Sequence, residues 1–256
     1  MIEIRNLAYT AKTEEGEKEI LRGVDLDIPD GRLIVVTGPN GGGKSTLARL
    51  VAGIAKPSGG SIVFDGRDIT GASITERARL GIGFAFQQPV RFKGLKVMDL
   101  LAIAAGRTLP KSEACDYLVS VGLCANDYLQ REVNSSLSGG ELKRIEIATV
   151  IAKASKVSIF DEPEAGIDLW SFQSLIDTFR NMRRTIADSS IVIISHQERI
   201  LAIADEIVVI KDGLIARHGP KAAVLPSLIG TSMAAPGCPK FGRGDAPVIT
   251  EGKIHA

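Results

Sequence analysis

Nine residues from Gly38 to Thr46, GPNGGGKST, combine glycines with a lysine and two hydroxyl side chains. They fit the pattern G-x-x-x-x-G-K-[ST], in which the glycines let backbone N–H groups turn toward phosphate oxygens. The pattern predicts that Lys44 reaches the β- and γ-phosphates of a nucleotide and that Ser45 binds Mg²⁺. The contacts expected from this loop are those of Asn40, Gly41, Gly43, Lys44, Ser45 and Thr46.

Two carboxylates, Asp161 and Glu162, come directly after the apolar run of VSIFDE. In a doubly wound sheet ligands lie at the carboxyl ends of the strands, so both side chains are expected near the phosphate loop. We expect Asp161 to hold Mg²⁺ through water and Glu162 to act as general base on the attacking water. The alternative is a turn that begins with two solvated acids.

The elements that position these residues alternate between strands and helices. RLIVVTG, KVSIFDE and SSIVIIS predict buried strands, and KSTLARLVAGI predicts the helix that follows the phosphate loop. EIVVIKDGLIARHG predicts a hairpin that turns at Asp-Gly. Helical patterns also occur at about 97–106, 111–121, 139–154, 168–187 and 197–204.

The predicted fold class is α/β: a P-loop NTPase (RecA-like) core with a parallel sheet, an N-terminal antiparallel β layer and an inserted α-helical subdomain. We expect a single nucleotide-binding domain over 1–225, with its core at 1–88 and 156–225. The segment at about 89–155 has helical periodicity and predicts the inserted subdomain. Residues 226–256 are rich in glycine and proline and predict an extended tail.

Composition excludes several classes of protein. The chain carries 31 basic and 30 acidic residues, a net charge of +1, and only 5% aromatics, so a dedicated nucleic-acid binder is not expected. Cys115, Cys124 and Cys238 are widely spaced and predict neither a zinc site nor a disulfide framework. The chain lacks a signal-peptide pattern and a membrane-length apolar run, so we expect a cytoplasmic protein without a membrane span of its own.

The order of further motifs points to a family. LSGGELKR occupies Leu137–Arg144 and precedes IFDEPEAGID, which is followed by IISH. This order resembles that of the ATP-binding cassette (ABC) ATPases, over roughly residues 1–222 of the chain. The resemblance implies hydrolysis of ATP with Mg²⁺. It also implies that Gln87, or the adjacent Gln88, contacts Mg²⁺ and the attacking water, and that His196 contacts the γ-phosphate.

The same resemblance implies a site shared between subunits. Ser138, Gly139 and Gly140 match the signature motif that binds the γ-phosphate of ATP held by another subunit. The expected working unit is therefore a sandwich of two ATPase subunits, formed by two copies of this chain or by this chain and a related partner. Ala165 stands where the family's D-loop has a serine, which puts contacts of that hydroxyl in doubt.

An aromatic side chain near the N-terminus stacks on adenine in many members of the family. The aligned position here is Ala11, and Tyr9 lies two residues earlier. We include Tyr9 among the candidate nucleotide contacts, although packing within a strand is the favoured interpretation.

The partner of the ATPase is open between two classes. FAFQQPVRFKG, LSGGELKR and SHQERIL are similar to segments of the ATPase of SUF iron–sulfur cluster assembly (SufC), which predicts a soluble SufB-like scaffold protein as partner. The alternative is the nucleotide-binding subunit of a transporter, with a transmembrane permease as partner. DEPEAGID departs from the SUF pattern D-E-x-D-S-G-L-D, and a role for Cys238 in the tail is not expected.

Overall fold

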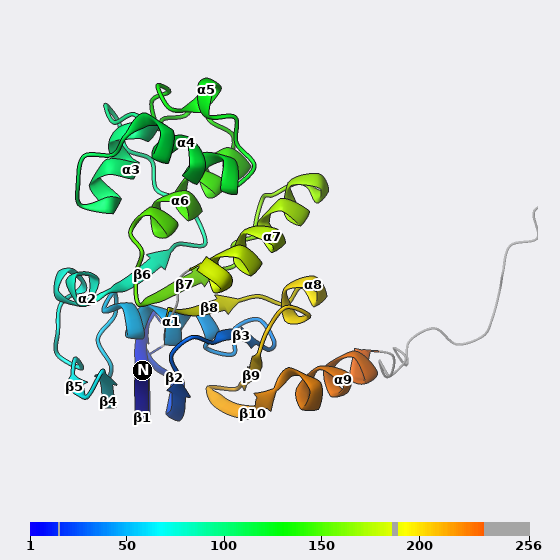
Figure 1. Cartoon of the computed structure of the whole chain (residues 1–256). Helices are drawn as coiled ribbons and strands as arrows, with labels where there is room; N and C mark the ends of the chain where they lie inside the picture. The colour runs from blue at the N-terminus through cyan, green and yellow to red at the C-terminus, as the bar shows by residue number, and fades with distance from the viewer. Residues whose placement is uncertain (15, 186–188, 233–256) are drawn as a thin grey trace, which may run out of the picture.

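The computed structural model describes residues 1–14, 16–185 and 189–232. In the described residues two sheets are packed with helices (Figure 1). One sheet has six strands in the order β10-β9-β3-β8-β7-β6, and the other has four strands in the order β2-β1-β4-β5. The predicted α/β architecture with an antiparallel N-terminal sheet is confirmed.

The six-stranded sheet forms from short strands, most of which are apolar. Its members are β3 (Leu33–Thr37), β6 (Ile82–Ala85), β7 (Val157–Asp161), β8 (Ser190–Ile194), β9 (Glu206–Lys211) and β10 (Leu214–Pro220). All residues of β3, β7 and β8 are buried, as expected for strands covered on both faces. Because β3, β8, β7 and β6 pair in parallel, their carboxyl ends meet at one edge of the sheet.

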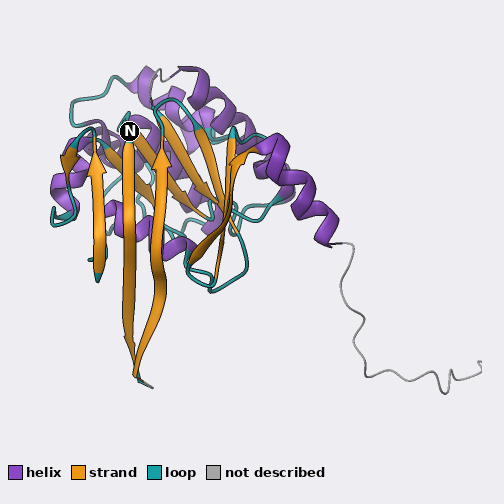
Figure 2. Ribbon diagram, turned by 90° about the horizontal axis from the view of Figure 1, so that it is seen from below, coloured by secondary structure: helices purple, strands orange, loops and turns teal. Residues whose placement is uncertain are grey.

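The four-stranded sheet packs beside the first one as a separate layer, in which β1 and β2 are the long strands (Figure 2). It consists of β1 (Ile2–Thr13), β2 (Gly16–Ile28), β4 (Gly59–Phe64) and β5 (Arg67–Asp68). Its apolar side chains share one core cluster with the inner face of β3 and with α1 (Lys44–Ala52). The phosphate-loop helix is therefore enclosed between the two sheets.

A lobe of helices stands above the six-stranded sheet in Figure 1. It contains α3 (Val97–Ala105), α4 (Lys111–Ser120), α5 (Ala125–Tyr128) and α6 (Gly139–Ala152). The buried side chains of these helices belong to the same apolar cluster as one face of the six-stranded sheet. The lobe is therefore anchored to the core by packing, chiefly through α6.

Several elements differ from the sequence-based expectations. The short helix α2 (Ile74–Leu80) and strand β6 were not expected, and α8 (Glu198–Leu201) is shorter than the predicted segment. Helix α7 (Leu169–Thr185) follows the expected range closely. Helix α9 (Lys221–Ser232) contains Pro226, so the start of the predicted tail is helical. The remainder of that tail, including Cys238, lies outside the described residues.

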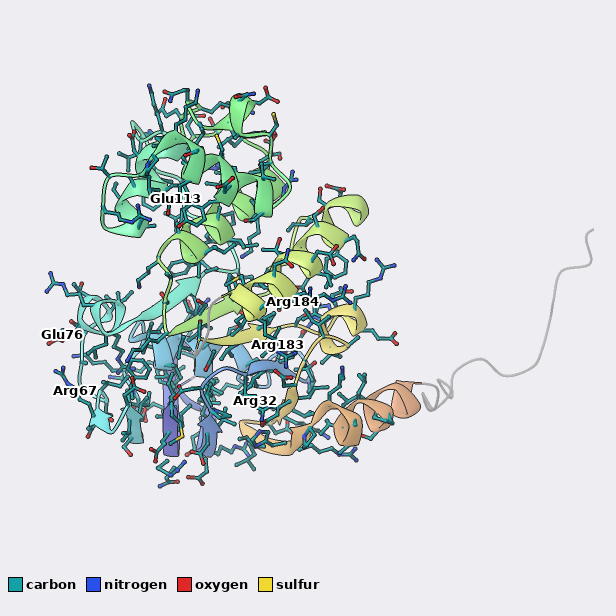
Figure 3. All side chains as sticks on the ribbon, viewed as in Figure 1. Arg32, Arg67, Glu76, Glu113, Arg183 and Arg184 are labelled. Carbon is teal, nitrogen blue, oxygen red and sulfur yellow. The ribbon has the colours of Figure 1, made fainter. Side chains whose placement is uncertain are left out.

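Charged side chains cover the outer surfaces of both the core and the helical lobe (Figure 3). Glu76 on α2 is exposed, whereas the neighbouring Arg77 is only 1% exposed and points inward. Arg183 at the end of α7 forms an ion pair of 2.5 Å with Asp205, which precedes β9.

None of the described helices is long and apolar enough to cross a membrane.

Candidate active site

A cleft of about 510 Å³ opens at the edge where the parallel strands end. It collects residues from the phosphate loop and from the segments after β6, β7 and β8, together with two residues of β2. The lining residues are Lys18, Ile20, Asn40, Gly41, Gly43, Lys44, Ser45, Thr46, Gln87, Glu162 and His196. All the expected phosphate-loop contacts therefore lie in one cleft with the expected Gln87, Glu162 and His196.

The phosphate loop needs glycine at two positions for steric reasons. Gly38 has φ 132°, and a Cβ atom there would lie 2.0 Å from the carbonyl oxygen of Ile210. Gly43 has φ 108°, and its Cβ would lie 2.6 Å from the Leu21 side chain. Gly43 is also the N-cap of α1, and no side chain of the described residues caps it. The first N–H groups of α1 therefore face the cleft, as an anion site requires.

Lys44 lies on the floor of the cleft with its ammonium group turned toward the loop. Its Nζ donates hydrogen bonds of 2.9 Å to the carbonyl oxygens of Gly38 and Pro39. Burial lowers the pKa of Lys44, and the nearby carboxylates of Glu162 and Asp161 oppose that effect. The two carbonyl oxygens offer the ammonium group only partial negative charges. A phosphate group in the cleft would offer it a full negative charge.

Ser45, which lines the cleft, and the buried Asp161 behind it form a pair that fits a hard cation. Ser45 Oγ donates a 2.9 Å hydrogen bond to Asp161 Oδ1. Asp161 Oδ2 is buried and has no hydrogen-bond partner among the described residues. Burial is the main cause that raises the pKa of Asp161. A hydroxyl beside a carboxylate with a free buried oxygen is a suitable donor set for Mg²⁺, which prefers oxygen ligands.

Gln87 and Glu162 face each other across the mouth of the cleft. Gln87 Nε2 donates a 2.6 Å hydrogen bond to Glu162 Oε2. Glu162 has φ 45°, an uncommon backbone conformation for a residue with a side chain, and its N–H donates to Ile194 O at 3.0 Å. The bond to the end of β8 holds this strained turn, so the Glu162 carboxylate is displayed in the cleft beside Gln87.

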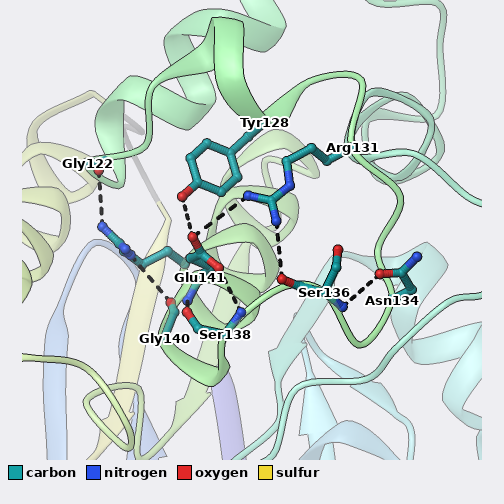
Figure 4. A network of polar contacts seen from close by, with 9 residues as sticks. Gly122, Tyr128, Arg131, Asn134, Ser136, Ser138, Gly140 and Glu141 are labelled. Atoms are coloured by element: carbon teal, nitrogen blue, oxygen red, sulfur yellow. Dashed lines mark hydrogen bonds and ion pairs between the residues drawn. The ribbon is translucent and has the colours of Figure 1, made fainter.

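The signature segment lies elsewhere, at the start of α6 (Figure 4). Ser138 is the N-cap: its Oγ accepts from the N–H of Glu141 at 3.2 Å, and the Glu141 carboxylate accepts from the N–H of Ser138 at 2.7 Å. Gly140 packs closely, since a Cβ there would lie 2.9 Å from Gly166 O. Ser138, Gly139 and Gly140 are not among the residues described as lining the cleft.

Tyr9 also lies outside the residues described as lining the cleft. It pairs with Leu21 in the β1–β2 ladder and packs against the core cluster, which agrees with the favoured interpretation. Sequence reasoning missed Lys18 and Ile20. Ala11, the position aligned with the family's aromatic residue, pairs with Lys18 across the β1–β2 ladder. It is this partner, Lys18, that reaches the cleft.

Comparison with known proteins decides the family. Residues 21–165 match the family model described as ABC transporter. The chain belongs to the ABC transporter ATP-binding cassette family. It is 38% identical over 212 residues to an uncharacterized ABC transporter ATP-binding protein of Methanocaldococcus jannaschii, covering 80% of this chain and 84% of that one. It is 32% identical over 216 residues to the sulfate/thiosulfate import ATP-binding protein CysA of Neisseria meningitidis, covering 82% of this chain and 59% of the relative.

Solved structures show the same fold for this cassette. A dimeric post-hydrolysis structure of the ATP-binding cassette MJ0796, bound to ADP and Pi, matches with a TM-score of 0.77 and 22% identity, over 86% of this chain and 99% of that one. The chain is therefore an ABC ATPase that binds and hydrolyses ATP. The names of the relatives point to transport and do not support the SUF assignment expected from the sequence.

Proposed function

We propose that this cassette hydrolyses ATP between two copies of itself. The observation that carries the proposal is the separation of two phosphate-binding helix ends. The phosphate loop lies in the cleft with Gln87, Glu162 and His196, whereas Ser138 at the start of α6 lies outside the lining of that cleft. A second copy would supply its own Ser138, Gly139 and Gly140 to the ATP held here, and the dimeric MJ0796 cassette supports such an arrangement.

Within that half-site, each side chain has one proposed role. Glu162 accepts a proton from the attacking water, and Gln87, which already bonds to it, orients that water. His196 donates to the γ-phosphate. Ser45 and Asp161 would hold Mg²⁺, with Gln87 nearby, and the ion would neutralise charge on the β- and γ-phosphate oxygens. Lys44 exchanges its two carbonyl partners for phosphate oxygens.

Glu162→Gln tests the chemistry and the dimer together. The amide keeps the size of the side chain but cannot accept the proton, so turnover should fall by about 1,000-fold while ATP binding is retained. A trapped dimer should then elute from a gel-filtration column run in Mg-ATP. Glu198→Gln is the matched control, because Glu198 is exposed on α8 and is not among the described residues that line the cleft. Normal turnover in Glu162→Gln would exclude Glu162 as the base.

The cassette has a surface beside the Gln87 segment that is suitable for docking a partner protein. An apolar groove of about 230 Å³ opens between that segment, α3 and α6. Three of its side chains are exposed to an unusual degree for apolar groups: Val90 by 46%, Phe92 by 42% and Ile103 by 65%. The lining residues are Phe84, Phe86, Val90, Phe92, Leu100, Ile103, Ala104, Val133, Leu142, Ile145, Glu146 and Thr149.

The first candidate partner is a transmembrane permease, with the cassette on its cytoplasmic side. It is favoured by the relatives named as import and transporter ATP-binding proteins. The second candidate is a soluble SufB-like iron–sulfur scaffold. It is favoured by the likeness of the segment from Ala85 to Gly94, part of which lines the groove, to the SUF ATPase. Both candidates use the same ATP-driven closure.

Co-purification of the tagged cassette from its own cells separates these candidates. Recovery with an integral membrane protein in detergent supports the permease, and recovery with a soluble scaffold supports the SUF assignment. Phe92→Glu should abolish either association. Val119→Glu is the matched control, since Val119 is 64% exposed on α4 and is not described as lining the groove. Equal recovery with both variants would exclude the groove as the docking site.

A further inference from the structure

A buried lysine and a partly buried glutamate on α6 lie between the apolar groove and the nucleotide cleft. Lys143 is 0% exposed. Its Nζ donates to the carbonyl oxygen of Phe86, lies 3.3 Å from Glu146 Oε2, and lies 3.5 Å from the carbonyl oxygens of Gln87 and Asp161. The ammonium group therefore joins α6 to the ends of both β6 and β7.

Glu146 completes the connection from the other side. Its Oε1 accepts a 2.9 Å hydrogen bond from the N–H of Phe86, while its Oε2 pairs with Lys143. Both backbone polar groups of Phe86 are thus bonded to α6, the N–H to Glu146 and the C=O to Lys143. Phe86 and Glu146 also line the apolar groove. Gln87, which follows Phe86, reaches Glu162 in the cleft.

Packing alone does not explain this pair. Burial lowers the pKa of Lys143 and raises that of Glu146, so the protein environment opposes both charges. Apolar side chains of similar size often stabilise a core as well as a buried ion pair, or better. Apart from the bond between them, the hydrogen bonds that the two side chains make here go to the backbone of Phe86, Gln87 and Asp161. The pair serves the geometry of these segments.

We propose that Lys143 and Glu146 are positioning residues that fix the Phe86–Gln87 segment to helix α6, so that both move as one body. Ser138 at the start of α6 and the Gln87 side chain then reach their two nucleotides together. This inference rests on the proposed sandwich of two cassettes.

The first experiment measures steady-state ATPase activity of Lys143→Met beside Lys153→Met. Lys153 is the matched control: it lies at the end of the same helix, and its Nζ donates a 2.7 Å bond to Ile82 O, away from Gln87 and Asp161. We expect kcat of Lys143→Met to fall by about 30–100-fold with KM for ATP within about threefold, because misplacement of a distant group affects the reacting geometry. An equal kcat in the two variants would overturn the proposal.

The second experiment uses the trapped dimer. Glu162→Gln alone should form the Mg-ATP dimer, and Lys143→Met/Glu162→Gln should remain largely monomeric although it binds ATP. Equal dimer formation by the two proteins would overturn the positioning role and leave the proposed function intact. Failure of Glu162→Gln itself to dimerise would count against the proposed function, and with it against this inference.

Glu146→Gln covers the case in which Lys143→Met does not fold. Glutamine keeps the size of the side chain and an oxygen that accepts from Phe86 N–H, but it removes the charge opposite Lys143. We expect kcat about tenfold lower, with faster amide hydrogen exchange in the peptide that contains Phe86 and Gln87. Unchanged kcat together with unchanged exchange would overturn the proposal.

Discussion

Two helices in this cassette begin at an end that is proposed to bind phosphate, and the two ends are built differently. Helix α1 begins at Gly43, which has no side chain to cap the helix, and its first turn contains no acid. Helix α6 begins at Ser138, whose hydroxyl and backbone N–H are both engaged by Glu141. The N–H groups of α1 therefore face the cleft ready for an anion, whereas α6 already satisfies part of its own end.

The far ends of the two helices differ as well. The last carbonyl groups of α1 accept from a buried guanidinium: Arg77 Nη1 donates to Leu50 O at 2.7 Å and to Val51 O at 3.0 Å. At the end of α6, Lys153 instead bonds to β6. The carboxyl end of α1 is thus held by Arg77 and its amino end is open, which suits a site that binds a nucleotide in the monomer. Helix α6 suits a site to which a second copy brings its nucleotide.

The largest expected effect concerns the clamp on α1. Arg77→Met would leave the carbonyl groups of Leu50, Val51, Thr70 and Ala72 without their buried donor. We expect the free energy of unfolding to fall by about 3 kcal/mol. In a chain of this length that loss lowers Tm by about 6–12 °C.

Thermal denaturation followed by circular dichroism measures this effect. Arg79→Met is the control, because Arg79 lies on the same short helix and is exposed. Equal melting temperatures in the two variants would show that α1 does not depend on the guanidinium at its carboxyl end.

The next effect concerns the open end of α1. Lys44→Met removes the cation that now bonds to Gly38 O and Pro39 O and that is expected to move to phosphate oxygens. ATP affinity should fall by about 100-fold, equivalent to about 3 kcal/mol, the size of a strong charged hydrogen bond. A fluorescent ATP analogue titrated into the monomer measures the affinity. A loss of less than about threefold would mean that the backbone N–H groups dominate binding.

The start of α1 is also the part of the site that the sequence predicted well. The phosphate loop, the strand before it and the helix after it are contiguous, so spacing alone placed Lys44 and Ser45 correctly in the cleft. The strands that end at Asp161 and before His196 are continuous apolar runs, and the rule for parallel strands brings their ends to one edge. The predicted roles of these residues stay predictions.

Other features depend on pairings between distant segments, which spacing does not encode. Lys18 reaches the cleft through the register of the β1–β2 hairpin, and Lys143 meets Phe86 only when α6 packs on β6. Strand β6 is four residues long, too short for a clear alternating pattern. The predicted tail begins at Pro226, but α9 continues past this residue to Ser232.

A smaller effect is expected at the capped end of α6. Ser138→Ala removes the hydroxyl that accepts from Glu141 N–H, which should destabilise the helix start by about 1 kcal/mol. ATP binding to the monomer should be unchanged, because Ser138 is not among the described residues that line the cleft. Dimerisation and kcat should fall by about tenfold if the same hydroxyl contacts the ATP of the second copy.

Ser136→Ala is the control for that variant, since Ser136 is exposed two residues earlier and its side chain does not cap α6. Activity and dimerisation are measured for both, with the dimer assayed in the Glu162→Gln background. A weakened monomer–ATP complex in Ser138→Ala would contradict the separation of the two ends.

The smallest expected effect concerns charge at the start of α6. The Glu141 carboxylate accepts from Ser138 N–H and from the hydroxyl of Tyr128, and Arg131 lies 3.9 Å away (Figure 4). These hydrogen bonds, the one from Tyr128 first, lower the pKa of Glu141, so it is charged at neutral pH. A negative charge at a helix end that receives the γ-phosphate of a second ATP opposes closure of the sandwich.

Glu141→Gln keeps an oxygen for Ser138 N–H, places an amide NH2 group opposite the Tyr128 hydroxyl and removes the charge. In the Glu162→Gln background the Mg-ATP dimer should tighten by about two- to fivefold, the range expected for one charge at a helix terminus. The gain should shrink when NaCl is raised from about 50 to about 500 mM, because salt screens exposed charges. Sedimentation equilibrium measures the dimer at both salt concentrations. A weaker dimer in Glu141→Gln would show instead that the carboxylate acts mainly through Tyr128 and Arg131, by holding the start of α6 in the shape that the second nucleotide requires.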